Sequence, residues 1–407
     1  MRTNSISIPS DTQFLLLGFV CLMLCPLLSI PFIIYGIYHR QKGAYLLLSL
    51  LLGVFAFISA PSEDIYRHYC QYEYFSIRPI TAIKMADVTL NGILPYLYWT
   101  MSHIGIPFSY LRFFELSVGF YLLSSIFSYM IEHSKHTYTQ KEYFMRFALF
   151  FAFFDFLYTT MGVKFGFALC VFLYCLHLFV HKNKKAAGIL FYLFACVWHF
   201  SFIFTGPILY SIYHFNPKKK TVLMGCFILA VLTPIVINLV GYYLFGRRFE
   251  FYFSKKADDV ASYSAMTPIG LILYILPKLT VIPLAITLFK HYNQDSKWCR
   301  FALGWFVLAI ILISNPVPFY RFWWAFMAIS IFFILDIENL STVFPQKTIK
   351  KLLICGILFT ALNMLTYHKE VQYSQYYRSI YPVPLALDSD YSKRWVFSNI
   401  QYDGDFK

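Results

Sequence analysis

Long apolar runs constrain the fold of this chain more than any other feature of its sequence. Three of the clearest cover residues 13–38, 221–245 and 269–289, each near or above the roughly 20 residues with which a helix spans a bilayer. Hydrophobic residues make up 59% of the chain and charged residues 13%, against about 25% charged residues in soluble domains. The runs are apolar on all sides, whereas the strands of a membrane barrel alternate apolar and polar residues. The sequence therefore predicts an all-α polytopic integral membrane protein surrounded by a phospholipid bilayer.

Basic residues gather in the short segments between the apolar runs. The six clusters are Arg40 and Lys42; Lys135, Lys141 and Arg146; Lys182, Lys184 and Lys185; Lys218 to Lys220; Lys290, Lys297 and Arg300; and Lys347, Lys350 and Lys351. Short cytoplasmic loops carry an excess of Lys and Arg. Placing all six clusters inside therefore accounts for the net charge of +14 without a nucleic-acid partner.

This charge pattern predicts about twelve transmembrane helices with both termini outside, in a single transmembrane domain of residues 1–407. The first run, 13–38, is interpreted as a retained span, because it is long for a signal peptide and lacks a small-x-small cleavage site. After a second span, the others are predicted at 107–131, 144–160, 165–180, 186–215, 221–245, 269–289, 299–315, 319–337 and 352–367. Segment 186–215 has basic flanks on both sides. It is interpreted as two short helices that meet near Trp198 and His199, or as one long tilted helix that breaks the charge rule.

Three segments are predicted to lie outside: the loops at about 60–106 and 247–267, and the tail at about 368–407. Within the first loop, residues 88–104 form an apolar stretch that is interrupted by Gly92 and Pro95. A full crossing here would move every later basic cluster to the wrong face. We therefore expect a short non-crossing or re-entrant helix.

The sequence PSEDIYRHYCQYEYF, directly after the second span, carries the densest set of reactive side chains. Ser62 is expected to cap a helix here. Pairs four residues apart share a helix face, so Glu63 is predicted to face Arg67, and Asp64 to face His68. This arrangement places acid, base and cation together at the membrane surface, although a capped helix with a surface salt bridge would leave the same pattern.

Other cations lie at predicted span ends on the same outer side. They are Lys164, Arg247, Arg248 and Arg321, with His199 at the turn within 186–215. Arginine suits phosphate and diphosphate groups because its planar fork donates two parallel hydrogen bonds and stays charged. Arg321 follows a proline-rich turn that fixes its depth, whereas external arginines in general are also found solvated or bound to lipid headgroups.

Charged residues inside the apolar runs are costly and indicate cavities or partners. Asp155 and Lys278 are of this kind, and Arg112 with Glu115, one turn apart, is interpreted as a pair that satisfies itself. No His, Cys or carboxylate cluster has the spacing of a metal site, and neither a Walker loop nor a dinucleotide fingerprint occurs. The sequence predicts no metal and no cofactor.

Four segments of the chain resemble motifs of one protein family. SEDIYRHY resembles the Ser-x-Asp-x-Tyr-Arg-x-Tyr pattern of Wzy-type O-antigen polymerases, in the EpsG-like branch of polysaccharide polymerases. MGVKFGFALCVFLYCL with HKNKK is similar to the Arg-x-x-x-Ala helix and basic turn of that family, WHFSFIFTGPIL to its His-Ser helix, and FYRFWWAF to its late arginine helix. Lys164 stands where the family usually has arginine, so its role as a forked phosphate clamp is in doubt.

The resemblance implies a metal-independent membrane glycosyltransferase with a GT-C-like architecture, in the inner membrane of a bacterium. Such an enzyme transfers a growing glycan from undecaprenyl diphosphate to the non-reducing end of another lipid-linked repeat unit, on the periplasmic face. Undecaprenyl-diphosphate-linked oligosaccharides and a chain-length regulator protein are the implied partners. The outer loops and the tail would then be periplasmic.

Site roles follow from combining this resemblance with the residue types. Diphosphate binding is assigned to Arg67 and Arg321, and less firmly to Lys164, Arg247 and Arg248. The base that accepts the proton of the sugar hydroxyl is expected to be Asp64, then Glu63 or His199. Tyr66, His68 and Tyr69 are predicted to contact the substrate, with interfacial anchoring as the alternative for the tyrosines. Two other functions remain open: a flippase or transporter of the lipid-linked unit, and an O-antigen ligase or acyltransferase.

Overall fold

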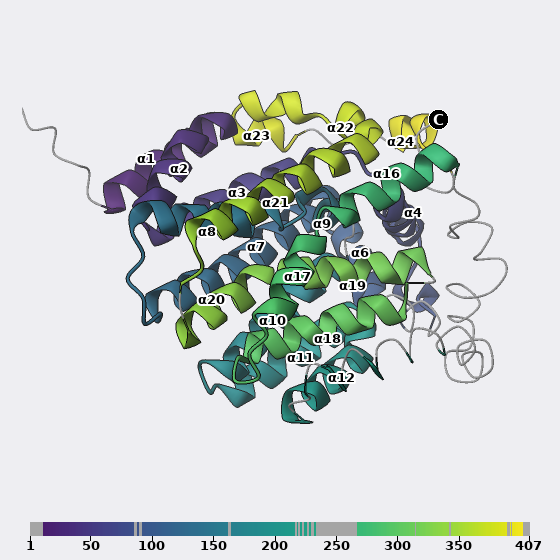
Figure 1. The fold of residues 1–407 in the computed structure, drawn as a ribbon. Helices are drawn as coiled ribbons and strands as arrows, with labels where there is room; N and C mark the ends of the chain where they lie inside the picture. The colour runs from purple at the N-terminus through teal and green to yellow at the C-terminus, as the bar shows by residue number, and fades with distance from the viewer. Residues whose placement is uncertain are drawn as a thin grey trace, which may run out of the picture.

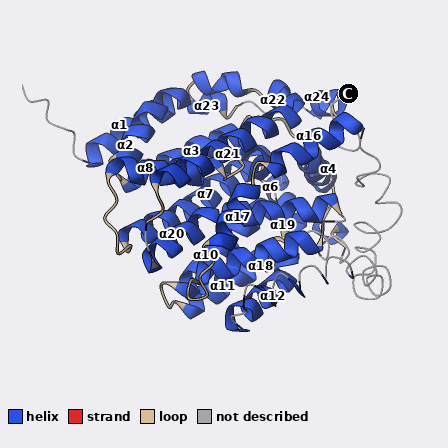
Figure 2. Cartoon of the chain, viewed as in Figure 1, coloured by secondary structure: helices blue, strands red, loops and turns tan. Residues whose placement is uncertain are grey.

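The computed structural model describes most of the chain as helices. The described residues are 11–84, 88, 92–161, 164–215, 218, 220–221, 224–225, 228, 232, 267–313, 315–341, 343–388, 391 and 393–401. Within them the structure contains helices and loops and no strand, as Figure 2 shows. The predicted all-α class is therefore confirmed. The predicted span 221–245 and outer loop 247–267 fall almost entirely outside the described residues.

The elements follow one another as short and long helices (Figure 1). The first part comprises α1 (Asp11–Leu24), η1 (Pro26–Ser29), α2 (Ile30–Tyr38), α3 (Lys42–Phe57), α4 (Glu63–Ser76), η2 (Ile80–Ala82), α6 (Leu94–His103), α7 (Ser109–Glu132), α8 (Gln140–Ala152), α9 (Phe156–Met161), α10 (Phe165–Val180), α11 (Lys185–Trp198) and α12 (Ser201–Phe215). The second part comprises α16 (Pro268–Leu279), α17 (Ile282–Lys290), α18 (Lys297–Ile311), α19 (Pro316–Ala328), α20 (Ser330–Leu340), α21 (Gln346–Thr366), α22 (His368–Tyr373), η4 (Tyr376–Ile380), α23 (Val383–Ala386) and α24 (Lys393–Asn399).

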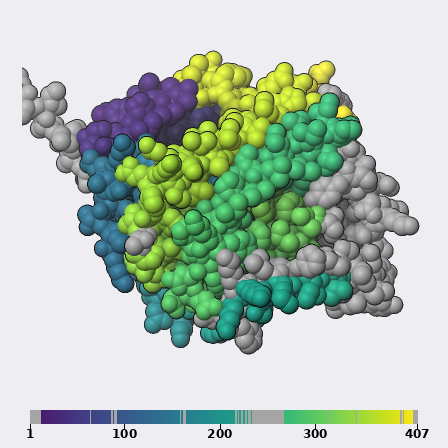
Figure 3. All heavy atoms as spheres, viewed as in Figure 1, coloured from purple at the N-terminus to yellow at the C-terminus, as the bar shows by residue number. Residues whose placement is uncertain are grey.

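Four helical segments are long and apolar enough to cross a membrane. They are Ser109–Glu132, Pro268–Lys290, Pro316–Leu340 and Gln346–Thr366. In Figure 3, α16 and α17 lie beside α21 across one face of the molecule. Ile269, Ile272, Ile354 and Ile357 are exposed along these helices. Exposed apolar side chains on spanning helices are what a lipid-facing surface requires, so the chain is a membrane protein.

The prediction that residues 13–38 form one continuous span is wrong. The chain breaks between α1 and η1, where Cys25 is extended and Pro26 cannot continue the helix of α1. The ring of Phe14 on α1 then lies 5.1 Å from that of Tyr35 on α2. Residues at opposite ends of the run are thus in contact, and α1 and α2 form a helical hairpin.

A second predicted span, 144–160, is interrupted in the structure. Helix α8 ends at Ala152 and α9 begins at Phe156, with Asp155 in the turn between them. Hydropathy gives no sign of this break because the residues around it are apolar. Of the two alternatives for 186–215, the structure has the two short helices: α11 ends at Trp198, and the backbone of His199 is extended.

The short helix expected in the first outer loop is α6, which is ten residues long. At 1.5 Å per residue it reaches about 15 Å, roughly half of the hydrocarbon thickness. Gly92 precedes it with a positive φ of 62°. A side chain at that position would meet the carbonyl oxygen of Val197 at the end of α11, so only glycine allows this approach.

The basic clusters meet at one end of the bundle, which we call the basic end. Contacts between the clusters and neighbouring turns establish this: Lys42 forms an ion pair with Glu132 at 3.0 Å, Arg40 donates to the Tyr138 carbonyl, the Lys135 amide donates to Asn339 at 2.8 Å, and Lys297 donates to the Val180 carbonyl at 3.3 Å. These contacts join the first, second and fifth clusters to turns and helix ends elsewhere in the chain.

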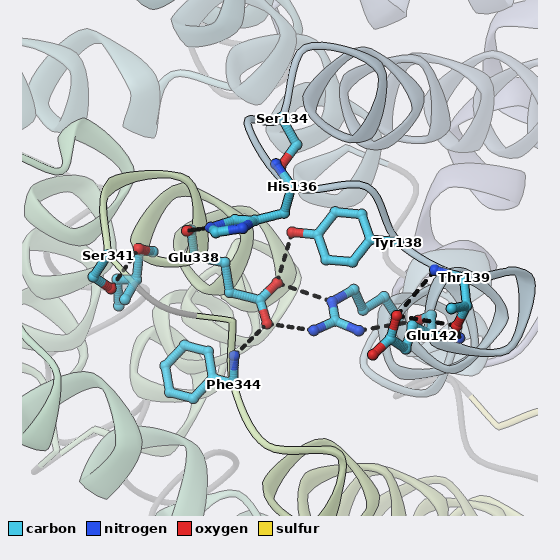
Figure 4. A network of polar contacts seen from close by, with 10 residues as sticks. Ser134, His136, Tyr138, Thr139, Glu142, Glu338, Ser341 and Phe344 are labelled. Atoms are coloured by element: carbon cyan, nitrogen blue, oxygen red, sulfur yellow. Dashed lines mark hydrogen bonds and ion pairs between the residues drawn. The ribbon is translucent and has the colours of Figure 1, made fainter.

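A buried ion pair at the basic end joins α8 to α20. The Nε of Arg146 on α8 donates to Glu338 Oε2 on α20 at 2.9 Å, and Tyr138 OH donates to the same oxygen at 2.9 Å. The backbone amide of Phe344 donates to the other carboxylate oxygen at 2.9 Å, as Figure 4 shows. A buried charge pair needs such additional hydrogen bonds to offset its desolvation.

The C-terminal segment covers the opposite end of the bundle, where α4 and α24 lie (Figure 1). Tyr391 OH donates to the carbonyl of Ile58 at 3.1 Å, just after α3. On α24, Lys393 forms an ion pair with Glu73 of α4 at 2.8 Å, and Phe397 packs against Tyr66 at 6.3 Å between ring centroids. The last described helix is therefore part of the packing around α4.

Candidate functional site

The site begins at the connection between α3 and α4. Arg112 on α7 donates to the carbonyls of Phe57 and Ser59 at 3.1 and 2.9 Å. These carbonyls lie at the last residue of α3 and two residues beyond it, where unpaired acceptors and the helix dipole favour a cation. Ser62 then takes the N-cap position of α4 in an extended conformation, but its side chain makes no capping hydrogen bond. The predicted N-cap position of Ser62 is therefore confirmed, but its capping hydrogen bond is not formed, and Arg112 contributes to fixing the connection.

Asp64 lies in the first turn of α4, close to its predicted partner His68 and also to Arg67. Its carboxylate is 3.8 Å from His68 Nε2, at the predicted spacing of four residues. It is 3.9 Å from Arg67 Nη1, three residues away. The sequence paired Arg67 with Glu63 instead, and the side chain of Glu63 lies outside the described residues. Asp64 and Arg67 keep 33% and 46% of their side-chain surface exposed, so the pair is open to a ligand.

Two more cations reach this carboxylate from distant parts of the chain. Lys164 occupies the N-cap position of α10, and Arg321 lies in the second turn of α19. Both side chains are half-buried, and both act electrostatically on Asp64. We call Asp64, Arg67, His68, Lys164 and Arg321 the outer cluster.

The charges of the outer cluster decide its protonation state. Burial alone would raise the pKa of Asp64, but His68, Arg321, Lys164 and Arg67 outweigh it and hold the pKa at about 2. Burial and the Lys164 charge lower the pKa of His68 to about 3, against the opposing effect of Asp64. At neutral pH the cluster therefore has three cations, one carboxylate and a neutral imidazole, which leaves two net positive charges.

The outer cluster lies at the far ends of helices whose other ends belong to the basic end. α3 runs from Lys42 to the connection before Asp64, and α10 runs from Lys164 to Val180. α19 and α20 together run from Pro316, in the turn before Arg321, to the last residues of α20, where Asn339 contacts Lys135. The outer cluster and the basic clusters are therefore separated by the length of the bundle.

His199 lies close to the start of α10 but is buried. Its ring is 5.3 Å from that of Phe165, the residue after Lys164. Its Nδ1 accepts a hydrogen bond from the Ser201 amide at 3.3 Å and lies 2.7 Å from Ser201 Oγ. These contacts hold the ring at the break between α11 and α12.

Tyr66 and Tyr69 are both buried on the face of α4 that meets α24. Their rings lie 6.3 and 6.4 Å from that of Phe397, and Tyr69 also contacts Phe108 at 6.1 Å. In this arrangement the two tyrosines pack within the protein and offer no open ring face to a sugar. Arg247 and Arg248, the remaining predicted phosphate-binding residues, lie outside the described residues.

The hydrogen-bond partners of Glu115 and Asp155, two acidic residues near the site, were not predicted from the sequence. Glu115 accepts a hydrogen bond from Trp198 Nε1 at 2.8 Å, so Arg112 and Glu115 have separate hydrogen-bond partners instead of simply satisfying each other.

Asp155 accepts hydrogen bonds from the side chains of Tyr320 and Asn363. The sequence marked Asp155 as an unusual charge, but it gave no indication of these two partners. Asn363, a polar residue inside the apolar run of α21, is the sequence feature that could have suggested one of them.

No group of three or more His, Cys, Asp or Glu side chains among the described residues is arranged to hold a metal ion. The chemistry that the outer cluster itself offers is electrostatic. Three cations around one ionised carboxylate can bind a multiply charged anion and stabilise charge that develops on it.

Comparison with known proteins adds one match. A model of the EpsG family matches residues 66–379. No curated protein and no solved structure matches the chain. The matched region covers most of the sequence and includes Arg67, Lys164, His199 and Arg321, while Asp64 lies two residues before it.

Proposed function

The chain belongs to the EpsG family, which includes proteins similar to Wzy-type polysaccharide polymerases, and we propose that it is an O-antigen or related surface-polysaccharide polymerase. Family membership indicates a polysaccharide-polymerase-like function. The proposed reaction transfers the growing glycan from undecaprenyl diphosphate to the non-reducing end of a lipid-linked repeat unit. The protein is then a glycosyltransferase of the bacterial inner membrane, with its active site on the periplasmic face.

The observation that supports this reaction most directly is the grouping of Arg67, Lys164 and Arg321 around Asp64. A lipid diphosphate carries two to three negative charges near the membrane surface, and the two net positive charges of the outer cluster complement them. Arg321 and Lys164 begin or lie near the start of apolar helices. That depth suits a phosphate group joined to a membrane-embedded polyprenyl chain.

In the proposed step, the acceptor hydroxyl oxygen forms a bond to the anomeric carbon of the donor sugar. The bond between that carbon and the diphosphate oxygen breaks, and undecaprenyl diphosphate leaves with the electron pair. Arg321, Lys164 and Arg67 stabilise the charge on the leaving group. Asp64 takes the proton of the acceptor hydroxyl.

A pKa of about 2 makes Asp64 a weak base in the unliganded protein. The same cations that lower this pKa are the proposed diphosphate ligands. Bound diphosphate would offset their positive charge and raise the pKa of Asp64 towards the value at which a carboxylate can accept a proton. Proton acceptance would therefore follow donor binding.

A polymerisation assay tests the function. Full-length protein in lipid nanodiscs, supplied with an undecaprenyl-diphosphate-linked repeat unit from the native host, should convert it into a ladder of longer glycans. Each added unit should release one undecaprenyl diphosphate, measured by mass spectrometry. Transport of the lipid-linked unit without any lengthening would reject the polymerase and favour a flippase.

The orientation in the membrane gives a separate prediction. We expect the basic end to face the cytoplasm and residues 250–265 to face the periplasm. In a variant without its native cysteines, a cysteine placed at Ser262 should react with a thiol reagent that cannot cross the inner membrane. A cysteine placed at Asn183 should react only after the membrane is opened, and the reverse labelling pattern would contradict the proposed topology.

A further inference from the structure

A second set of polar residues lies buried beside the outer cluster. It consists of Asp155, Lys278, Tyr320 and Asn363, which we call the buried tetrad. All four side chains are largely inaccessible to solvent. They come from the α8–α9 turn, α16, α19 and α21, so one small group joins four separate parts of the chain.

Asp155 is the centre of the tetrad. Its Oδ2 accepts hydrogen bonds from Tyr320 OH at 2.8 Å and from Asn363 Nδ2 at 2.9 Å. Asn363 Nδ2 also lies 3.2 Å from Tyr320 OH. The three side chains thus form a closed triangle, in which each member fixes the position of the other two.

Lys278 brings a basic group to the tetrad. Its ammonium group lies 3.3 Å from the ring centroid of Tyr274 and 4.1 Å from that of Tyr320, and it is attracted electrostatically by Asp155. Tyr274 OH donates in turn to the carbonyl of Pro316, the first residue of α19, at 2.7 Å. The beginning of α19 is therefore held on two sides, at Pro316 and at Tyr320.

The tetrad is connected to the outer cluster through the chain itself. Tyr320 immediately precedes Arg321, and Asp155 begins the short segment through α9 that leads to Lys164. Burying charged groups within an apolar bundle is costly, and well-packed apolar residues often replace such pairs without loss of stability. Stability alone is therefore a weak reason for four polar residues at this place.

We propose that the buried tetrad is a positioning unit that holds Arg321 and Lys164 at the depth and orientation needed to bind the diphosphate. The hydroxyl of Tyr320 fixes the turn of α19 that carries Arg321. The carboxylate of Asp155 fixes the start of α9 and hence the approach to Lys164. This inference rests on the proposed function, because it assigns the two cations to diphosphate binding.

The test measures binding of farnesyl diphosphate, a short-chain probe, to the full-length protein in nanodiscs by isothermal titration calorimetry. Tyr320→Phe removes one hydroxyl and keeps the ring. We expect it to weaken binding about tenfold, the low end of what partners that orient a binding group contribute. Asp155→Asn should have a similar effect.

A double-mutant cycle separates positioning from general damage. If Tyr320 acts through Arg321, then Tyr320→Phe should cause no further loss of affinity once Arg321→Ala is present. Tyr138→Phe is the matched control, since Tyr138 OH donates to the buried carboxylate of Glu338 at 2.9 Å at the basic end. This control should leave the affinity for farnesyl diphosphate unchanged.

The outcomes distinguish the two proposals. If Arg321→Ala weakens binding but Tyr320→Phe does not, the positioning unit is rejected while the diphosphate site stands. A loss caused by Tyr320→Phe that persists fully in the Arg321→Ala background also rejects it. If the unchanged protein fails to bind the probe, or Arg321→Ala has no effect, the diphosphate site and the positioning unit are both overturned.

Discussion

Replacing Arg321 with alanine is expected to slow polymerisation by about 100- to 1,000-fold, the range observed when one donor to a developing oxyanion is removed. Arg321→Lys should be only slightly better, because an ammonium group cannot reproduce the two parallel hydrogen bonds of the guanidinium fork. The measurement is the rate of glycan lengthening in nanodiscs, together with the ladder of chain lengths in cells that express each variant at the normal level.

Arg78 provides a matched control for the loss of one arginine. It lies beyond the end of α4, stacks over the Tyr74 ring at 4.2 Å and is exposed. Arg78→Ala removes the same charge without touching the outer cluster, so we expect nearly full activity. A full ladder of chain lengths from Arg321→Ala would mean that this arginine has only a structural role.

Asp64→Asn is expected to reduce polymerisation by at least about 100-fold, because the amide neither accepts the proton nor balances three neighbouring cations. The side-chain volume hardly changes, so the protein should reach the membrane in normal amounts. Cells that depend on this variant should carry surface lipids with a single repeat unit. Glycan lengths on gels and protein abundance on immunoblots measure the two quantities.

Glu73→Gln tests whether the effect is specific to Asp64. Glu73 lies on the same helix and forms an ion pair with Lys393, but it does not belong to the outer cluster. This variant should retain its full range of chain lengths. Normal polymer in Asp64→Asn cells would exclude Asp64 as the base and leave Glu63 and His199 as the candidates proposed from the sequence.

The sequence predicted the local part of the site and could not predict the rest from spacing alone. Asp64 and His68 are one helical turn apart, so helical periodicity was enough to place them together. Lys164 and Arg321 reach the same carboxylate from α10 and α19. The charge pattern placed both cations on the outer side, and the family resemblance gave them a shared role. Neither predicted that they act on Asp64, since contacts between distant helices leave no periodic signal in one sequence.

The positions of the helix breaks could not be predicted from hydropathy. Apolar runs predicted the all-α class and the existence of most helices, but not where each run is interrupted. The turn at Asp155 lies within an apolar stretch and depends on Tyr320 and Asn363, which come much later in the chain. Pro26, by contrast, was visible in the sequence, yet the length of the run 13–38 favoured a single span over a hairpin.

The position of α24 has a consequence for the way this protein is made. Helix α4 is synthesised well before Phe397 and Lys393, the residues of α24 that cover it. Nascent chains in which α4 is already in the membrane therefore lack the packing of α24 against it. The order of synthesis thus delays the packing around α4 until α24 has been made, so a chain that stalls before α24 would occupy the membrane with this face of α4 uncovered.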